Sequence, residues 1–136
     1  MDFFTAMEVS ASGLGAQRVR MNVASSNLAN VSTTSANGGG PYVRKNVTVA
    51  ADPVEGAAPG VSGVTVTGIV DDARAPRLEY DPGHPEADVD GYVAYPNVNP
   101  VEEMVDMITA SRAYEAGVTA LSTSVSMAER ALGIGR

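Results

Sequence analysis

The residues with the most versatile chemistry gather between positions 81 and 90. The single histidine, His84, lies within Asp81-Pro-Gly-His-Pro85, a turn-dense stretch. A histidine there could serve as a general base, because its ordinary pKa lies near neutrality. Catalysis needs convergent acids, bases, nucleophiles or metals, and one histidine does not supply them. We interpret His84 as a solvated or turn-packing side chain.

The acidic stretch that follows imitates the start of a calcium-binding loop. Glu86-Ala-Asp88-Val-Asp90-Gly91 places carboxylates at alternate positions, as such loops do. The glutamate expected at the twelfth position is missing, and Asn97 stands there instead. We therefore interpret residues 86–90 as a solvated acidic loop that leads into a strand, and we expect no metal site.

Other catalytic signatures are missing from the sequence. It contains no Gly-x-Ser-x-Gly, P-loop or dinucleotide fingerprint, and Gly38-Gly-Gly40 is better explained as a flexible loop. The chain has no cysteine, which excludes disulfides, zinc–thiolate sites and thiol catalysis. We expect a protein without enzymatic activity and without a cofactor.

Charge and hydropathy exclude two further classes of partner. The formal net charge is −7, and the basic residues are scattered rather than arranged in a stripe. Binding to nucleic acid or to an anionic membrane surface is therefore not expected. No apolar run approaches the roughly 18 residues of a membrane-spanning helix. The first residues also lack a basic, then apolar, secretory signal, so we expect any export to proceed without cleavage of such a signal.

The elements that position these residues begin with a helix predicted over residues 3–30. Apolar residues recur there every seven positions, the segment has no proline, and Asp2 can cap its start. Gly13 and Gly15 weaken it by about 1 kcal/mol each relative to alanine. The recurring positions are Met7, Leu14, Met21 and Leu28.

Residues 31–98 have a different character. They hold seven of the eight prolines and most of the glycines, which separate short runs of β-forming residues. We expect a small, irregular β-rich module with loops at 35–41 and 55–60. The predicted strands are Tyr42–Val49, Val64–Val70, Leu78–Tyr80 and Tyr92–Tyr95.

The C-terminal part, residues 99–136, carries the clearest helical signal. Asn99 is a good N-cap, Pro100 suits the first helical position, and Glu102 completes a capping box. Gly133 and Gly135 end the pattern. The apolar positions alternate in steps of three and four, as in a coiled-coil seam: Met104, Met107, Ser111, Tyr114, Val118, Leu121, Val125, Ala128 and Leu132.

These observations predict a mainly α-helical protein with a small β-rich middle module. The helices of 1–30 and 99–136 are too long for residues 31–98 to cover. We expect them to pair as a coiled coil that forms one core domain, and we expect neighbouring subunits to complete the fold by covering the remaining apolar surface. The alternative is an ordinary helical hairpin in a monomer.

Several short motifs resemble those of the rod and hook proteins of the bacterial flagellum. The first is Ser26-Asn-Leu-Ala-Asn-Val-Ser-Thr33, which contains Asn27, Ala29 and Asn30. The C-terminal half resembles, more specifically, the C-type proximal rod proteins of the basal body. Its matching segments are Tyr80–Pro85, Gly91-Tyr92-Val93, Pro96-Asn97-Val-Asn99-Pro100-Val-Glu-Glu-Met104 and Ala110-Ser-Arg-Ala-Tyr-Glu-Ala116.

This resemblance implies a structural subunit of the proximal rod, the periplasm-spanning axle of the basal body. The terminal helices would form an inner layer around the export channel, and the middle segment an outer β-rich part. Implied partners are copies of itself, other rod proteins, the ring-to-rod adaptor and the flagellar type III export apparatus. The alternative is a secreted helical-arm binding or assembly module unrelated to the rod.

The asparagines in these motifs have two interpretations each. Asn27 and Asn30 can satisfy carbonyls at the end of the first helix or bridge to a neighbour. Asn99 is expected to cap its own helix, whereas Asn97 can contact an adjacent subunit.

Overall fold

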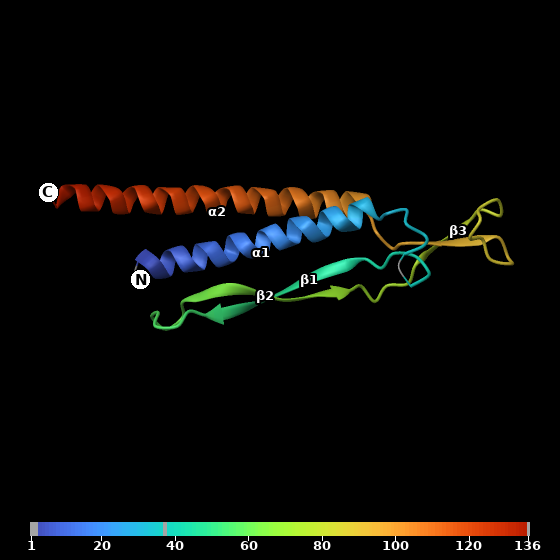
Figure 1. The fold of residues 1–136 in the computed structure, drawn as a ribbon, viewed down its shortest axis with the longest axis horizontal. Coiled ribbons are helices and arrows are strands. Elements are labelled where there is room, and N and C mark those ends of the chain that lie inside the picture. Colours follow the sequence, from blue (N-terminus) through green and yellow to red (C-terminus); the bar gives the residue numbers. More distant parts are fainter. Residues whose placement is uncertain (1–2, 37, 136) are drawn as a thin grey trace.

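The computed structural model describes residues 3–36 and 38–135, so the cap predicted at Asp2 lies outside the described residues. Two long helices, α1 (Phe3–Ala29) and α2 (Pro100–Ile134), run side by side. Figure 1 shows a two-stranded ribbon lying along α1 on the side away from α2, and a second hairpin beyond the end of both helices. The predicted class, long paired terminal helices with a small β module between them, is confirmed.

The start of α2 has the N-cap and the proline that its sequence predicts, whereas Glu102 makes no described hydrogen bond to Asn99, so the predicted capping box does not form. The Asn99 side chain accepts a hydrogen bond from the Val101 N–H at 3.0 Å, and Pro100 occupies the first helical position. Two acidic residues in the first turn, Glu102 and Glu103, complement the positive end of the helix dipole. At the other end, the Gly135 N–H donates to the Leu132 carbonyl. Of the helices that the structure describes, none is long and apolar enough to cross a membrane.

The contact between the two helices is made through small residues. Ala110 of α2 is fully buried, and Ala24 of α1, which lies close to Glu103, is buried as well. Gly117 lies so close to α1 that a Cβ on it would stand 2.8 Å from Cδ2 of Leu14. The helices therefore approach closely, and little apolar area is buried between them, as expected for a chain with few large aromatics.

The two stripes of the predicted seam on α2 have different surroundings. Met107, Tyr114, Leu121 and Ala128 are half-buried, and between them lie the buried Ala110 and the half-buried Gly117 and Ser124. The second stripe contains Met104, Val118, Val125 and Leu132. It is more open: Met104, Val118 and Leu132 are 47, 43 and 77% exposed, and only Val125 of these four is half-buried. On α1, Met7, Leu14, Met21 and Leu28 are all half-buried. Within the described chain, α1 covers one stripe of α2 and leaves much of the other open.

The middle module consists of two separate antiparallel hairpins. Strand β1 (Lys45–Pro53) pairs with β2 (Ser62–Asp71), with an irregularity between Thr48 and Val49. The short strands β3 (Arg77–Tyr80) and β4 (Tyr92–Tyr95) form the second hairpin. All four predicted strands exist, although β1 begins three residues later and ends four residues later than predicted.

The ribbon formed by β1 and β2 contacts α1 at Gly63, a residue without a side chain. The Val64 N–H donates to the Ser12 hydroxyl at 3.0 Å. A Cβ on the neighbouring Gly63 would lie 2.8 Å from that hydroxyl oxygen, so glycine permits the close approach.

Gly91, at the start of β4, provides a test of the second hairpin. Its φ of +82° favours glycine, and a Cβ would lie 2.9 Å from the Tyr80 ring. We expect Gly91→Ala to destabilise the hairpin by about 1–3 kcal/mol, measured as faster amide hydrogen exchange at Asp81 and Tyr92. Gly83→Ala is the control, because a Cβ there meets only an ordinary contact. Equal exchange in the two variants would contradict this account.

Candidate functional site

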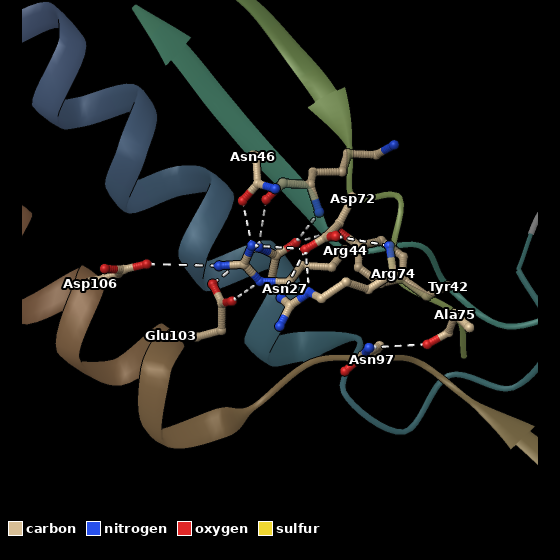
Figure 2. Close-up of polar contacts among 11 residues, drawn as sticks. Asn27, Tyr42, Arg44, Asn46, Asp72, Arg74, Ala75, Asn97, Glu103 and Asp106 are labelled. Atoms are coloured by element: carbon tan, nitrogen blue, oxygen red, sulfur yellow. Dashed lines mark hydrogen bonds and ion pairs between the residues drawn. The ribbon is translucent and has the colours of Figure 1, made fainter. Parts of the chain in front are cut away.

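A polar junction joins α1, β1 and α2 near the end of the helix pair (Figure 2). We define it by the side chains that interact there: Asn27, Tyr42, Arg44, Asn46, Asp72, Arg74, Glu103 and Asp106. They come from both helices, from β1 and from the segments that flank the ribbon. The junction is the place in the described chain where the three parts predicted from the sequence meet.

Asn27 is the hub of the junction. Its amide oxygen accepts hydrogen bonds from the Lys45 N–H at 3.0 Å and from the Tyr42 hydroxyl at 2.9 Å. Its amide nitrogen donates to the Lys45 carbonyl at 2.9 Å and to Oε2 of Glu103 at 3.0 Å. The amide thus pairs with the outer edge of β1 as a neighbouring strand would, and it links that strand to both helices.

Glu103 is the buried charge of the junction, with 1% of the residue exposed. Its other oxygen, Oε1, accepts from Nε of Arg44 at 2.5 Å. The same guanidinium also contacts Asn46, Asp72 at 3.4 Å and Asp106 at 3.8 Å. A buried carboxylate is tolerated only when it is paired and hydrogen-bonded, and Arg44 and Asn27 together meet that requirement.

Asp72 extends the network toward the surface. Hydrogen bonds from the Arg74 guanidinium, and then from the Arg74 N–H, hold the pKa of the Asp72 carboxyl well below its usual range. The same contact raises the pKa of Arg74. At the ribbon edge, the Asp71 carboxylate likewise raises the pKa of Lys45 through a hydrogen bond at 2.5 Å. Each of these pKa shifts favours the charged form of Asp72, Arg74 or Lys45.

The junction is organised to hold the chain together. Among the described residues, no buried side-chain nitrogen or oxygen lacks a hydrogen-bond partner. The buried polar atoms of the junction are therefore satisfied by one another. Throughout the described residues, no three His, Asp or Glu side chains lie close enough together to hold a metal ion.

The asparagines that the sequence motifs singled out make different kinds of contact. Asn30 donates to the Ser26 carbonyl at 2.8 Å, so it satisfies the end of α1. Asn27, one turn earlier, instead bridges to β1 and α2 of its own chain. Asn97 donates to the Ala75 carbonyl at 3.0 Å, across the base of the second hairpin. Pro96, beside it, is buried, whereas Ala29 is exposed and Pro100 half-buried.

His84 and Asp88, which the sequence offered as a candidate general base and a candidate calcium ligand, both take part in turns. Nδ1 of His84 accepts from the Glu86 N–H at 3.1 Å, and its ring lies edge-on to Tyr95. Oδ1 of Asp88 accepts from the N–H groups of Asp90 and Tyr92, both at 2.9 Å. These contacts agree with the turn-packing interpretation of His84. The interpretation of residues 86–90 is a solvated acidic loop leading into a strand, and their three carboxylate residues are exposed just before β4.

Sequence reasoning missed the central pair, Arg44 and Glu103. One signal for Glu103 was present. It lies seven residues before Ala110 and fourteen before Gly117, so helical periodicity places it on the face that packs against α1. A charged residue on such a face requires a partner. Nothing in the sequence indicates that this partner is Arg44, 59 positions away.

Comparison with known proteins adds the decisive observation. The family described as "Flagella basal body rod protein" matches residues 7–36, and "Flagellar basal body rod FlgEFG protein C-terminal" matches residues 89–134. The chain is 43% identical to the flagellar basal-body rod protein FlgC of Bacillus subtilis, with all of both chains covered. It is 44% identical to that of Borreliella burgdorferi, over 98% of each chain, and 40% identical to that of Salmonella typhimurium, over all of each.

The chain belongs to the FlgC family of flagellar basal-body rod proteins. This confirms the resemblance seen in the motifs. Because the relatives are named as structural rod proteins, it also confirms the expectation of a structural, non-enzymatic subunit. The two matched regions contain Asn27 and Glu103, whereas Arg44 and Asp72 lie between them.

The junction predicts a large difference between two adjacent glutamates. Glu103→Leu leaves the Arg44 guanidinium without its main partner, and we expect it to lower the free energy of unfolding by about 3 kcal/mol. Glu102→Leu is the control, because Glu102 is exposed in the same helical turn. Urea unfolding followed by circular dichroism measures both. Losses of equal size would show that the buried pair is not important for stability.

Proposed function

We propose that this chain is a structural subunit of the proximal rod, which spans the periplasm as part of the flagellar basal body. Its terminal helices would form an inner tube that surrounds the export channel and transmits torque. Family membership supports this proposal, together with the half-open seam on α2. A helix with two apolar stripes, of which its own chain covers only one, is suited to packing against a second helix.

The proposal assigns the open stripe of α2 to contacts with neighbouring subunits. Met104, Val118 and Leu132 are its exposed members, and Val125 lies between them. Met107, Tyr114 and Leu121 face α1 and position the stripe. On α1, Met7, Leu14, Met21 and Leu28 complete the helix pair. Burial of such apolar surface contributes about 25 cal/mol per Å², so many modest contacts add up to a stiff assembly.

The proposed partners are copies of this chain, the other rod proteins and the ring-to-rod adaptor. Delivery would use the flagellar type III export apparatus, without cleavage of a signal peptide. The secreted helical-arm module expected as an alternative is not favoured, because relatives that align with nearly all of the chain are named as basal-body rod proteins.

Composition of the basal body tests the proposal directly. We expect detergent-extracted basal bodies from the native host to contain this chain in a fixed ratio to the other rod proteins, and to lose it when the rod is lost. Quantitative mass spectrometry against labelled peptides measures the ratio. Absence from intact basal bodies would favour the secreted-module alternative.

A charge on the open stripe tests the surface that the proposal assigns. We expect Val118→Asp to abolish motility and rod assembly, because docking would bury an unpaired carboxylate. Val118 is partly exposed, so the free subunit should keep its helical circular dichroism. Val118→Leu is the matched control, since it keeps an apolar side chain there. Normal swimming of the Val118→Asp strain would show that this stripe is not an interface.

A further inference from the structure

The second hairpin exposes apolar and aromatic side chains on one face. We define this hairpin face by Leu78, Tyr80, Val89 and Tyr92. Leu78 and Tyr80 are 65 and 67% exposed, and Val89, at the tip, is completely exposed. Within the described chain, β3 and β4 pack against no other helix or strand, and Figure 1 shows the hairpin extending beyond the ends of α1 and α2.

The hairpin face is held in a fixed arrangement. The Tyr80 and Tyr92 rings meet edge to face, with centroids 5.4 Å apart, and the Tyr80 ring lies against Gly91. The Asp81 N–H donates to the Gly91 carbonyl, and Asp88 orders the turn through its two hydrogen bonds. Fixed aromatic side chains lose little conformational entropy on binding, and tyrosine is enriched at the energetic centres of interfaces.

The charge around the hairpin face is mostly negative. Residues 77–91 contain five acidic side chains and one basic side chain, Arg77. At the base of the hairpin, Arg77 is paired with Glu79 at 2.9 Å, and Arg74 with Asp72 at 2.8 Å. The apolar surface therefore has an acidic border, which favours a partner of opposite charge and disfavours nucleic acid or an anionic membrane.

We propose that the hairpin face docks a different protein, one that offers an apolar pocket bordered by lysine or arginine. A second copy does not fit this description, because the chain carries a net charge of −7 and its basic residues are scattered. The inference rests on the proposed function and extends it. The helices associate with neighbouring helices, whereas the hairpin holds a protein at the end of the helix pair.

Zero-length crosslinking in isolated basal bodies tests the charge of the partner. Carbodiimide couples a carboxylate to a lysine amine only when the two are in contact. We expect peptides from residues 78–91 to be joined to lysines of a different protein chain. Coupling only to Lys45 of another copy would overturn the inference. So would no coupling beyond that seen at the exposed Glu55, together with full retention of the hairpin variants Asp90→Lys and Tyr80→Ser.

Matched substitutions test whether the face contributes to retention. We expect Asp90→Lys and Tyr80→Ser each to reduce the amount of chain retained per basal body by about tenfold, since like charges and lost aromatic contacts both weaken docking. The controls are Glu55→Lys, which makes the same change of charge, and Val49→Ser, which removes an exposed apolar side chain, both on the first hairpin. Circular dichroism of the purified variants checks folding.

The outcomes separate the two proposals. If the wild-type chain is present in basal bodies and the hairpin variants are retained as well as their controls, the inference is wrong and the rod function stands. If the wild-type chain is itself absent, the rod function is wrong and the inference fails with it. Selective loss of the hairpin variants, together with crosslinks to a lysine of another protein, supports both.

Discussion

The buried carboxylate of Glu103 is the constraint on which the arrangement of the three segments depends. It lies on the face of α2 that meets α1, where an unpaired charge would be strongly unfavourable. Arg44 and Asn27 satisfy it, and each of them is tied to β1 as well. One charge therefore ties one end of the ribbon to both helices, while Ser12 holds the other end through the Val64 N–H. In a chain with little apolar core, these polar contacts guide how the ribbon docks.

The remainder of the helix pair is held by much weaker contacts. Alanine and glycine at Ala110 and Gly117 allow close approach but bury little area. Ordering the backbone of a long helix costs about 1–2 kcal/mol per residue in conformational entropy. A helix pair with so thin a seam benefits from additional burial against neighbours, which the open stripe of α2 can provide. The stability of one subunit and its assembly with neighbours therefore depend on the same apolar surface.

The two ends of the molecule have different physical characters. At the free ends of the helices, the surface is apolar, with Phe4, Met127 and Leu132 exposed. At the other end, the second hairpin combines an aromatic face with an acidic border. The polar junction lies between these two regions, where the ribbon meets both helices.

The sequence by itself determined the elements. Asn99 and Pro100 place the start of α2, the heptad positions identify both helices, and prolines and glycines delimit the strands, because each of these signals acts through nearby backbone. The motifs around Asn27 and Pro96 identified the family. Only the tertiary structure decided which stripe of α2 meets α1, that the strands form two separate hairpins, and that Arg44 neutralises Glu103. Those features depend on contacts between residues far apart in the chain, about which local periodicity and composition carry no information.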